Sequence, residues 1–131
     1  MNKELWQRVE AIEHDLRMLS TLLIVVRRYT RRTPTYPVSG ELLDIITTLD
    51  AVADFAHTLS DDQRSRFHDI AFDLEIPFAL ARETQRDFTA KERRQVQEAV
   101  STLQAELESL VSQLEREEAQ LWEEIARSTE L

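Results

Sequence analysis

The chain has 131 residues, the ordinary size of one domain with one hydrophobic core. Its net charge of -9 at pH 7 argues against a general nucleic-acid binder, because a phosphate backbone attracts basic surfaces. The chain contains no cysteine, which excludes disulfides, thiolate metal sites and thiol nucleophiles.

One glycine and three prolines leave little material for tight turns, whereas strong helix formers are abundant. This composition predicts an all-α fold in a single domain over residues 1–131. We expect an antiparallel up-down four-helix bundle whose first and last helices are long and coiled-coil-like. From the apolar periodicity, the helices are predicted at about 3–32, 41–59, 61–88 and 90–127.

The first helix carries an apolar seam that alternates steps of four and three residues, a pattern typical of coiled coils and helical bundles. Beyond Leu16 a second stripe widens the apolar face, so this half of the helix needs several neighbours. The apolar run 19–26 is too short to span a membrane, which takes roughly 20 residues. The seam consists of Leu5, Val9, Ile12, Leu16, Leu19, Leu23 and Val26.

Two prolines, Pro34 and Pro37, end the first helix and predict a loop. The second helix resumes heptad spacing, with Leu42, Ile45, Leu49, Val52, Ala56 and Leu59 on its seam. The stretch from Ser60 to Gln63 is a capping box, in which the serine hydroxyl accepts from a backbone amide and the glutamine side chain reaches back. It predicts a tight turn and the start of the third helix.

The third helix shows apolar residues on two faces. Its seam includes Leu74, and Pro77 inside it is expected to kink the helix. A second stripe of Phe72, Ile76 and Ala79 lies on the opposite face. Either the bundle surrounds this helix, or the stripe is a surface where a partner helix or a second subunit docks.

A second capping box, Thr89 to Glu92, opens the last helix, whose seam is Val96, Val100, Leu103, Leu107, Leu110 and Leu114. At about 1.5 Å per residue the first and last helices outreach the second. Their far ends should form a two-helix stalk with too few neighbours, which predicts a homodimer through this region. The stalk residues are Leu5, Trp6, Val9, Ile12, Leu114, Leu121, Trp122 and Ile125.

The predicted topology gathers nine basic residues at the end opposite the stalk, interleaved with carboxylates. This basic end is a candidate anion-binding site for nucleic acid or another polyanion. Alternatively, the arginines neutralise neighbouring acids and remain solvated. A third hypothesis is that the glutamate-rich last helix imitates a phosphate backbone and inhibits a basic partner. The basic end consists of Arg27, Arg28, Arg31, Arg32, Arg82, Arg86, Lys91, Arg93 and Arg94.

Catalytic, metal and cofactor sites are not expected. The histidines His14, His57 and His68 fall away from the seams, and the nearest approach to a metal pair is Asp54 with His57. A Gly-rich phosphate loop is missing from the sequence, as is a Ser/His/Asp motif.

The chain begins with charged residues and without an early apolar core, unlike a secretory signal, so we expect a cytoplasmic protein without a membrane partner. The sequence favours a non-enzymatic, homodimeric protein-interaction module, acting as an adaptor, regulator or inhibitor on a protein partner that it does not identify. Nucleic-acid binding is the less favoured alternative.

Overall fold

The computed structural model describes residues 3–31 and 40–129, and all its regular elements are helices. They are α1 (Lys3–Arg31), α2 (Gly40–Phe55), α3 (Asp61–Glu83) and α4 (Ala90–Thr129). The described residues contain no strand, so the predicted all-α class is confirmed. None of these helices is long and apolar enough to cross a membrane.

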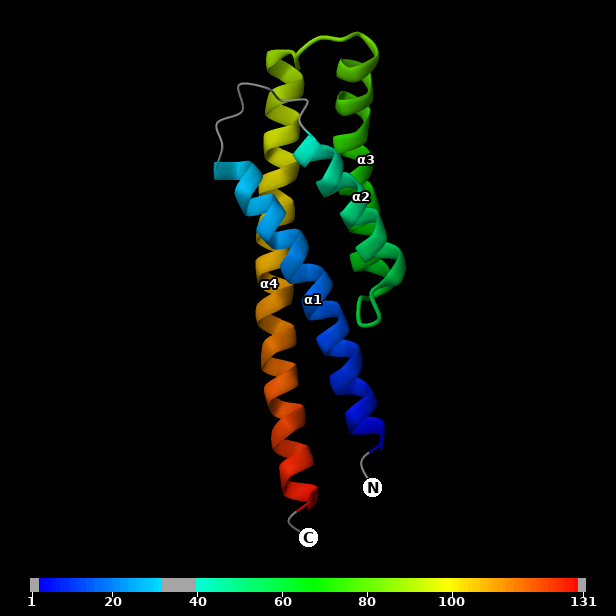
Figure 1. Cartoon of the computed structure of the whole chain (residues 1–131), viewed down its shortest axis with the longest axis vertical. Coiled ribbons are helices and arrows are strands. Elements are labelled where there is room, and N and C mark those ends of the chain that lie inside the picture. Colours follow the sequence, from blue (N-terminus) through cyan, green and yellow to red (C-terminus); the bar gives the residue numbers. More distant parts are fainter. Residues whose placement is uncertain (1–2, 32–39, 130–131) are drawn as a thin grey trace.

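The helices pack as an antiparallel bundle in which each contacts two others. Helix α1 contacts α2 and α4, and α3 also contacts α2 and α4. In Figure 1, α1 and α4 lie side by side, while α2 and α3 cover only the upper part of that pair. The N-terminal end of α1 and the C-terminal end of α4 lie together at the bottom of the view.

The predicted seams supply most of the hydrophobic core. Every seam residue from Leu42 to Leu59 and from Val96 to Leu114 is buried, as the periodicity requires. Helix α1 departs from the prediction at one turn. There Leu16 is only half-buried, while the neighbouring Asp15 is completely buried.

Both predicted capping boxes form. The hydroxyl of Ser60 accepts from the backbone N–H of Gln63 at 3.2 Å, and the Gln63 side chain accepts from the Ser60 N–H at 2.9 Å. The same exchange between Thr89 and Glu92 has distances of 3.1 and 2.9 Å. Helix α3 continues through Pro77 to its end. Local side chains therefore cap the starts of α3 and α4.

The prediction that the second helix reaches residue 59 is wrong, because α2 ends at Phe55. The backbone N–H groups of His57 and Thr58 donate to the Asp15 carboxylate on α1, at 2.9 and 2.6 Å. In a continuing helix these groups would donate to carbonyls one turn earlier. A partner from another helix therefore ends α2.

The prediction that the third helix reaches residue 88 is also wrong, because α3 ends at Glu83. Gln85 has a φ of 52°, in the left-handed region. The N–H of Arg86 donates to the carbonyl of Ala81 at 3.0 Å, and that of Gln85 to the carbonyl of Arg82 at 3.3 Å. These two bonds form a Schellman motif, which usually places glycine where this chain has glutamine.

Candidate protein-binding site

The second apolar stripe of α3 is exposed. Phe72 is 60% exposed and Ile76 45%, and Ala79 is also exposed. Leu80, which the sequence analysis did not include, is 45% exposed one turn after Ile76. The buried face of α3, with Leu74 at 0%, points the other way because these positions differ by about half a helical turn. The bundle therefore does not surround α3.

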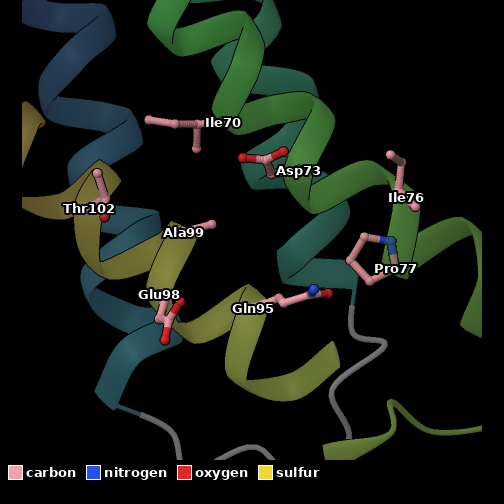
Figure 2. A pocket seen from close by; sticks show the side chains of 8 residues that line it. All are labelled: Ile70, Asp73, Ile76, Pro77, Gln95, Glu98, Ala99 and Thr102. Atoms are coloured by element: carbon pink, nitrogen blue, oxygen red, sulfur yellow. The ribbon is translucent and has the colours of Figure 1, made fainter. Parts of the chain in front are cut away.

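A groove of about 510 Å³ lies between α3 and α4 on one side of this stripe. Figure 2 shows the side chains that line it, four from each helix. Its apolar residues are Ile70, Ile76, Pro77 and Ala99, and its polar residues are Asp73, Gln95, Glu98 and Thr102. Ile76 belongs both to the exposed stripe and to the groove, so the two form one surface.

A second groove, of about 390 Å³, lies between α2 and α3 on the other side of the stripe. Its apolar residues include Leu43, which is 39% exposed, and Ala79 from the stripe. Asp50, Glu75 and Arg82 supply charge. The exposed stripe is thus a ridge with a hollow on each side, a shape that suits a helical partner.

The charged side chains of the α3–α4 groove are unengaged. Among the residues that the structure describes, neither Asp73 nor Glu98 has a hydrogen bond, ion pair or other electrostatic partner. Arginine and lysine are absent from the lining of this groove. Its local charge is therefore negative, and nothing within the described parts of the chain neutralises it at these two positions.

The stalk residues are packed within a single chain. Val9 and Ile12 on α1 are buried, as are Leu114, Leu121 and Ile125 on α4, while Leu5 is half-buried. The expectation that this seam lacks intramolecular neighbours is therefore wrong, because α1 and α4 bury each other's seam residues. The homodimer itself stays a prediction.

The two tryptophans of the stalk contact each other. The rings of Trp6 and Trp122 meet edge to face, with centroids 5.1 Å apart and planes at 86°, a favourable aromatic geometry. Trp6 is 46% exposed and Trp122 39%. The outer surfaces of both rings therefore remain in contact with solvent.

Part of the basic end is neutralised internally. The Arg27 guanidinium donates to the Glu108 carboxylate at 3.2 Å. Arg86 donates to Glu92 at 2.7 Å, and this hydrogen bond, with that from the Thr89 N–H, lowers the pKa of Glu92 to about 2.

The other described members of the basic end are exposed. Ile24 lies beside Arg27, Arg28 and Arg31 along one side of α1, while Arg32 lies outside the described residues. The remaining exposed cations come from α3 and α4: Arg82, Lys91, Arg93 and Arg94. The ion pairs of Arg27 and Arg86 reduce the free positive charge that a polyanion would meet.

The sequence analysis missed a polar cluster around Asp15. This carboxylate is 0% exposed and accepts hydrogen bonds from the N–H groups of His57 and Thr58, from the Thr58 hydroxyl and from Nδ1 of His14 at 3.0 Å. Burial alone would raise the pKa of Asp15, but these hydrogen bonds outweigh it and lower the pKa. The cluster ties α1 to the α2–α3 turn.

The α2–α3 turn is also held from α3. Arg64 donates to the carbonyl of Ala53 at 2.7 Å and to the carbonyl of Ala56, two groups that the end of α2 leaves without helical donors. A carboxylate from α1 thus accepts from the amides of the turn, and a guanidinium from α3 donates to the carbonyls before it. Both interactions fix the start of α3.

The potential metal ligand atoms of His14, Asp15 and His57 lie within 4.8 Å of one another. The two imidazole rings are stacked, with centroids 4.1 Å apart and planes within 6°. The lone pair of each ring nitrogen lies in its ring plane, so parallel rings direct their lone pairs along separate planes. An ion near 2 Å from both nitrogens would require one ring to rotate. The arrangement therefore favours a structural role.

His68 pairs differently from the sequence expectation. Its Nε2 lies 3.1 Å from Asp54 and its Nδ1 3.4 Å from Asp50, so Asp54 faces His68 rather than His57. All three side chains are about half exposed. This contact joins α2 to α3 at the surface.

Comparisons with protein-family models, with curated proteins and with solved structures give no match for this chain.

Proposed function

We propose that this protein is a non-enzymatic protein-binding module that docks a partner on the exposed stripe of α3, formed by Phe72, Ile76, Ala79 and Leu80. The observation that carries the proposal is the exposure of three large apolar side chains on consecutive turns of one helix. An apolar patch of this kind on one helix face often marks a binding surface.

The strength of such an interaction follows from the area that docking removes from water. Complete burial of a Phe, Ile or Leu side chain contributes about 1.5–3 kcal/mol, and these three side chains are already about half-buried, so the stripe contributes roughly 2–5 kcal/mol. Association alone costs at least about 4 kcal/mol. The grooves beside α3 must add to the binding energy, which favours a reversible partner.

The remainder of the bundle presents α3 in a fixed position. We propose the finer architecture expected from the sequence, an up-down four-helix bundle with coiled-coil-like α1 and α4. The buried seams on α1 and α4 and the intrachain stalk support it. Because the Asp15 cluster and the Ser60 capping box hold the start of α3, the partner would meet a preorganised surface.

A capture experiment tests this proposal. The full chain, a Phe72→Asp/Ile76→Asp variant and a control Ala105→Asp/Ala119→Asp variant are used as bait in extracts of the native host, and captured proteins are quantified by mass spectrometry. The control adds two charges at exposed positions of α4. We expect the same partner with the wild type and the control, and its loss with the α3 variant. Equal capture by all three would contradict the proposal.

Homodimerisation is a separate part of the proposal. The exposed rings of Trp6 and Trp122 support it, although the buried stalk seam no longer requires it. Light scattering at micromolar concentration measures it directly. A single species of 15.3 kDa would show that the chain is monomeric under those conditions and remove this part.

Polyanion binding by the basic end has weaker support, because Arg27 and Arg86 are already paired with carboxylates. An affinity for DNA or RNA that falls steeply with salt would revive it.

A further inference from the structure

We infer that the α3–α4 groove takes a basic amphipathic helix of the partner protein, with apolar side chains against the exposed stripe of α3 and lysines or arginines facing Asp73 and Glu98. This inference rests on the proposed function and adds the chemistry of the partner. The exposed stripe alone would accept any apolar helix. The charge and the backbone chemistry of the groove select among such helices.

The charge of the groove favours a basic partner. Asp73 on α3 and Glu98 on α4 both line the groove, and within the described residues neither is neutralised. Figure 2 shows them on the two helices that form the walls, with Ala99 beside Glu98. Asp69, exposed one turn before Asp73, adds a further negative charge on the same side of α3, while Arg94, exposed one turn before Glu98, places one positive charge at the edge of the α4 wall, so the carboxylates outnumber the cations here. Opposite charge on a partner would be complementary here, whereas an acidic helix would be repelled.

The backbone hydrogen bonding of α3 is interrupted beside the groove. Pro77 lies inside α3 and has no amide hydrogen, so it cannot donate to the carbonyl of Asp73 four residues earlier. Pro77 itself lines the groove. The carbonyl of Asp73 therefore lacks the N–H donor that it would have in an uninterrupted helix, and it belongs to the same residue as one of the unpaired carboxylates.

The shape of this surface suits a helix. Phe72, Ile76 and Leu80 follow one another at intervals of four residues, so they extend over about 12 Å of helix. A partner helix lying alongside needs only about three turns to contact all of them. The small side chains of Ala99 and Thr102 on the α4 wall leave room for larger apolar side chains of the partner.

Binding of two designed peptides to the full chain tests the inference. Each has roughly 18 residues, long enough for partial helicity in water, and carries leucines at helical spacing. One has lysines on both flanks of the leucine stripe, and the other has glutamates at the same positions. Fluorescence anisotropy gives the two dissociation constants. We expect the lysine peptide to bind at least about tenfold more tightly, and the difference to shrink as salt is raised.

Variants locate the binding. Asp73→Asn/Glu98→Gln should weaken lysine-peptide binding at least about fivefold, whereas Glu115→Gln/Glu123→Gln, which removes the same charge from exposed positions of the stalk, should change it less than about twofold. Ile76→Asp should weaken binding of both peptides. Circular dichroism on each variant verifies that it is folded.

The outcomes separate the inference from the proposed function. Equal affinity for both peptides, with both lost in Ile76→Asp, would overturn the basic partner and leave the α3 docking surface. Lysine-peptide binding that Ile76→Asp leaves unchanged would overturn both, since it would show attraction to the acidic chain as a whole. Failure of the lysine peptide to bind at about 100 µM would overturn the inference. A dimer detected by light scattering and disrupted by Ile76→Asp would instead identify a second copy as the occupant.

Discussion

The α2–α3 turn and the α3–α4 groove both contain carboxylates, but these are used in opposite ways. At the turn, Asp15 is completely buried and accepts hydrogen bonds from the backbone and side chains of other segments. In the groove, Asp73 and Glu98 have no partner within the described residues. The carboxylate at the turn stabilises the fold, whereas the two carboxylates in the groove form no interaction with the other described residues.

A structural carboxylate and a candidate binding carboxylate therefore differ in their hydrogen-bond partners, and not in their residue type. A buried charge persists only when hydrogen bonds replace the water that it has lost, as they do around Asp15. An exposed carboxylate beside an uncovered apolar stripe gains nothing within the monomer. Its gain comes when a partner is bound.

The largest expected effect contrasts the two faces of α3. Leu74→Asp should destabilise the protein by more than about 4 kcal/mol, because Leu74 is fully buried and an unpaired charge would replace it. Ile76→Asp should cost no more than about 1.5 kcal/mol, because Ile76 is only about half-buried. Urea denaturation of both variants measures this. If Ile76→Asp unfolds the protein as Leu74→Asp does, the exposed stripe belongs to the core.

The next largest loss of stability is expected at the α2–α3 turn. Asp15→Ala should destabilise the protein by about 2–4 kcal/mol, because it leaves buried donors of His57 and Thr58 without an acceptor. Asp69→Ala, at an exposed position of α3, is the matched control and should cost less than about 0.5 kcal/mol. The denaturant midpoints of Asp15→Ala and Asp69→Ala at pH 7 measure the two losses of stability. Equal and small losses would remove the structural role of Asp15.

The pH dependence of stability also tests the structural role of Asp15. Hydrogen bonds lower the pKa of Asp15 in the folded state, so its stabilising contribution is complete above the unfolded pKa near 3.8 and is lost as the pH falls through the folded pKa. The free-energy gap between wild type and Asp15→Asn should therefore be widest near neutral pH and narrow below about pH 4. Denaturation curves of both proteins from pH 7 to acid measure it. A gap that widens in acid would contradict this assignment.

The smallest effect is expected in the groove. Asp73→Asn/Glu98→Gln should change the free energy of unfolding by less than about 0.5 kcal/mol, since neither carboxylate has an intramolecular partner among the described residues. Thermal unfolding at low and high salt checks this. A loss comparable to that of Asp15→Ala would show that the groove acids, like Asp15, stabilise the fold.

The seams and helix starts could be predicted because their signals are local. The spacing from Leu42 to Leu59 and the two capping boxes each involve residues on one segment. The burial of Asp15 also agrees with the periodicity, since Ile12, Asp15 and Leu19 are separated by the same steps of three and four residues as the seam. The same periodicity equally admits Leu16, and a charged residue is rarely buried without partners, which for Asp15 include amides 42 and 43 residues later.

The C-terminal ends of α2 and α3 could not be predicted by the same means. The amides after Phe55 donate to Asp15 on α1, and the end of α3 uses Gln85 where glycine would have given a signal. Helix lengths alone do not show how completely two seams cover each other, so they underestimate the packing of the stalk.

The sequence by itself determined that the chain is helical, where the helices begin and which residues can face a core, because these properties follow from helical periodicity and from side chains within one turn. The tertiary structure alone decided where α2 ends, that Asp15 is buried and which apolar face of α3 remains in solvent. Burial is a property of two surfaces in contact. A helix with two apolar stripes does not reveal which one is covered until its neighbours are in place.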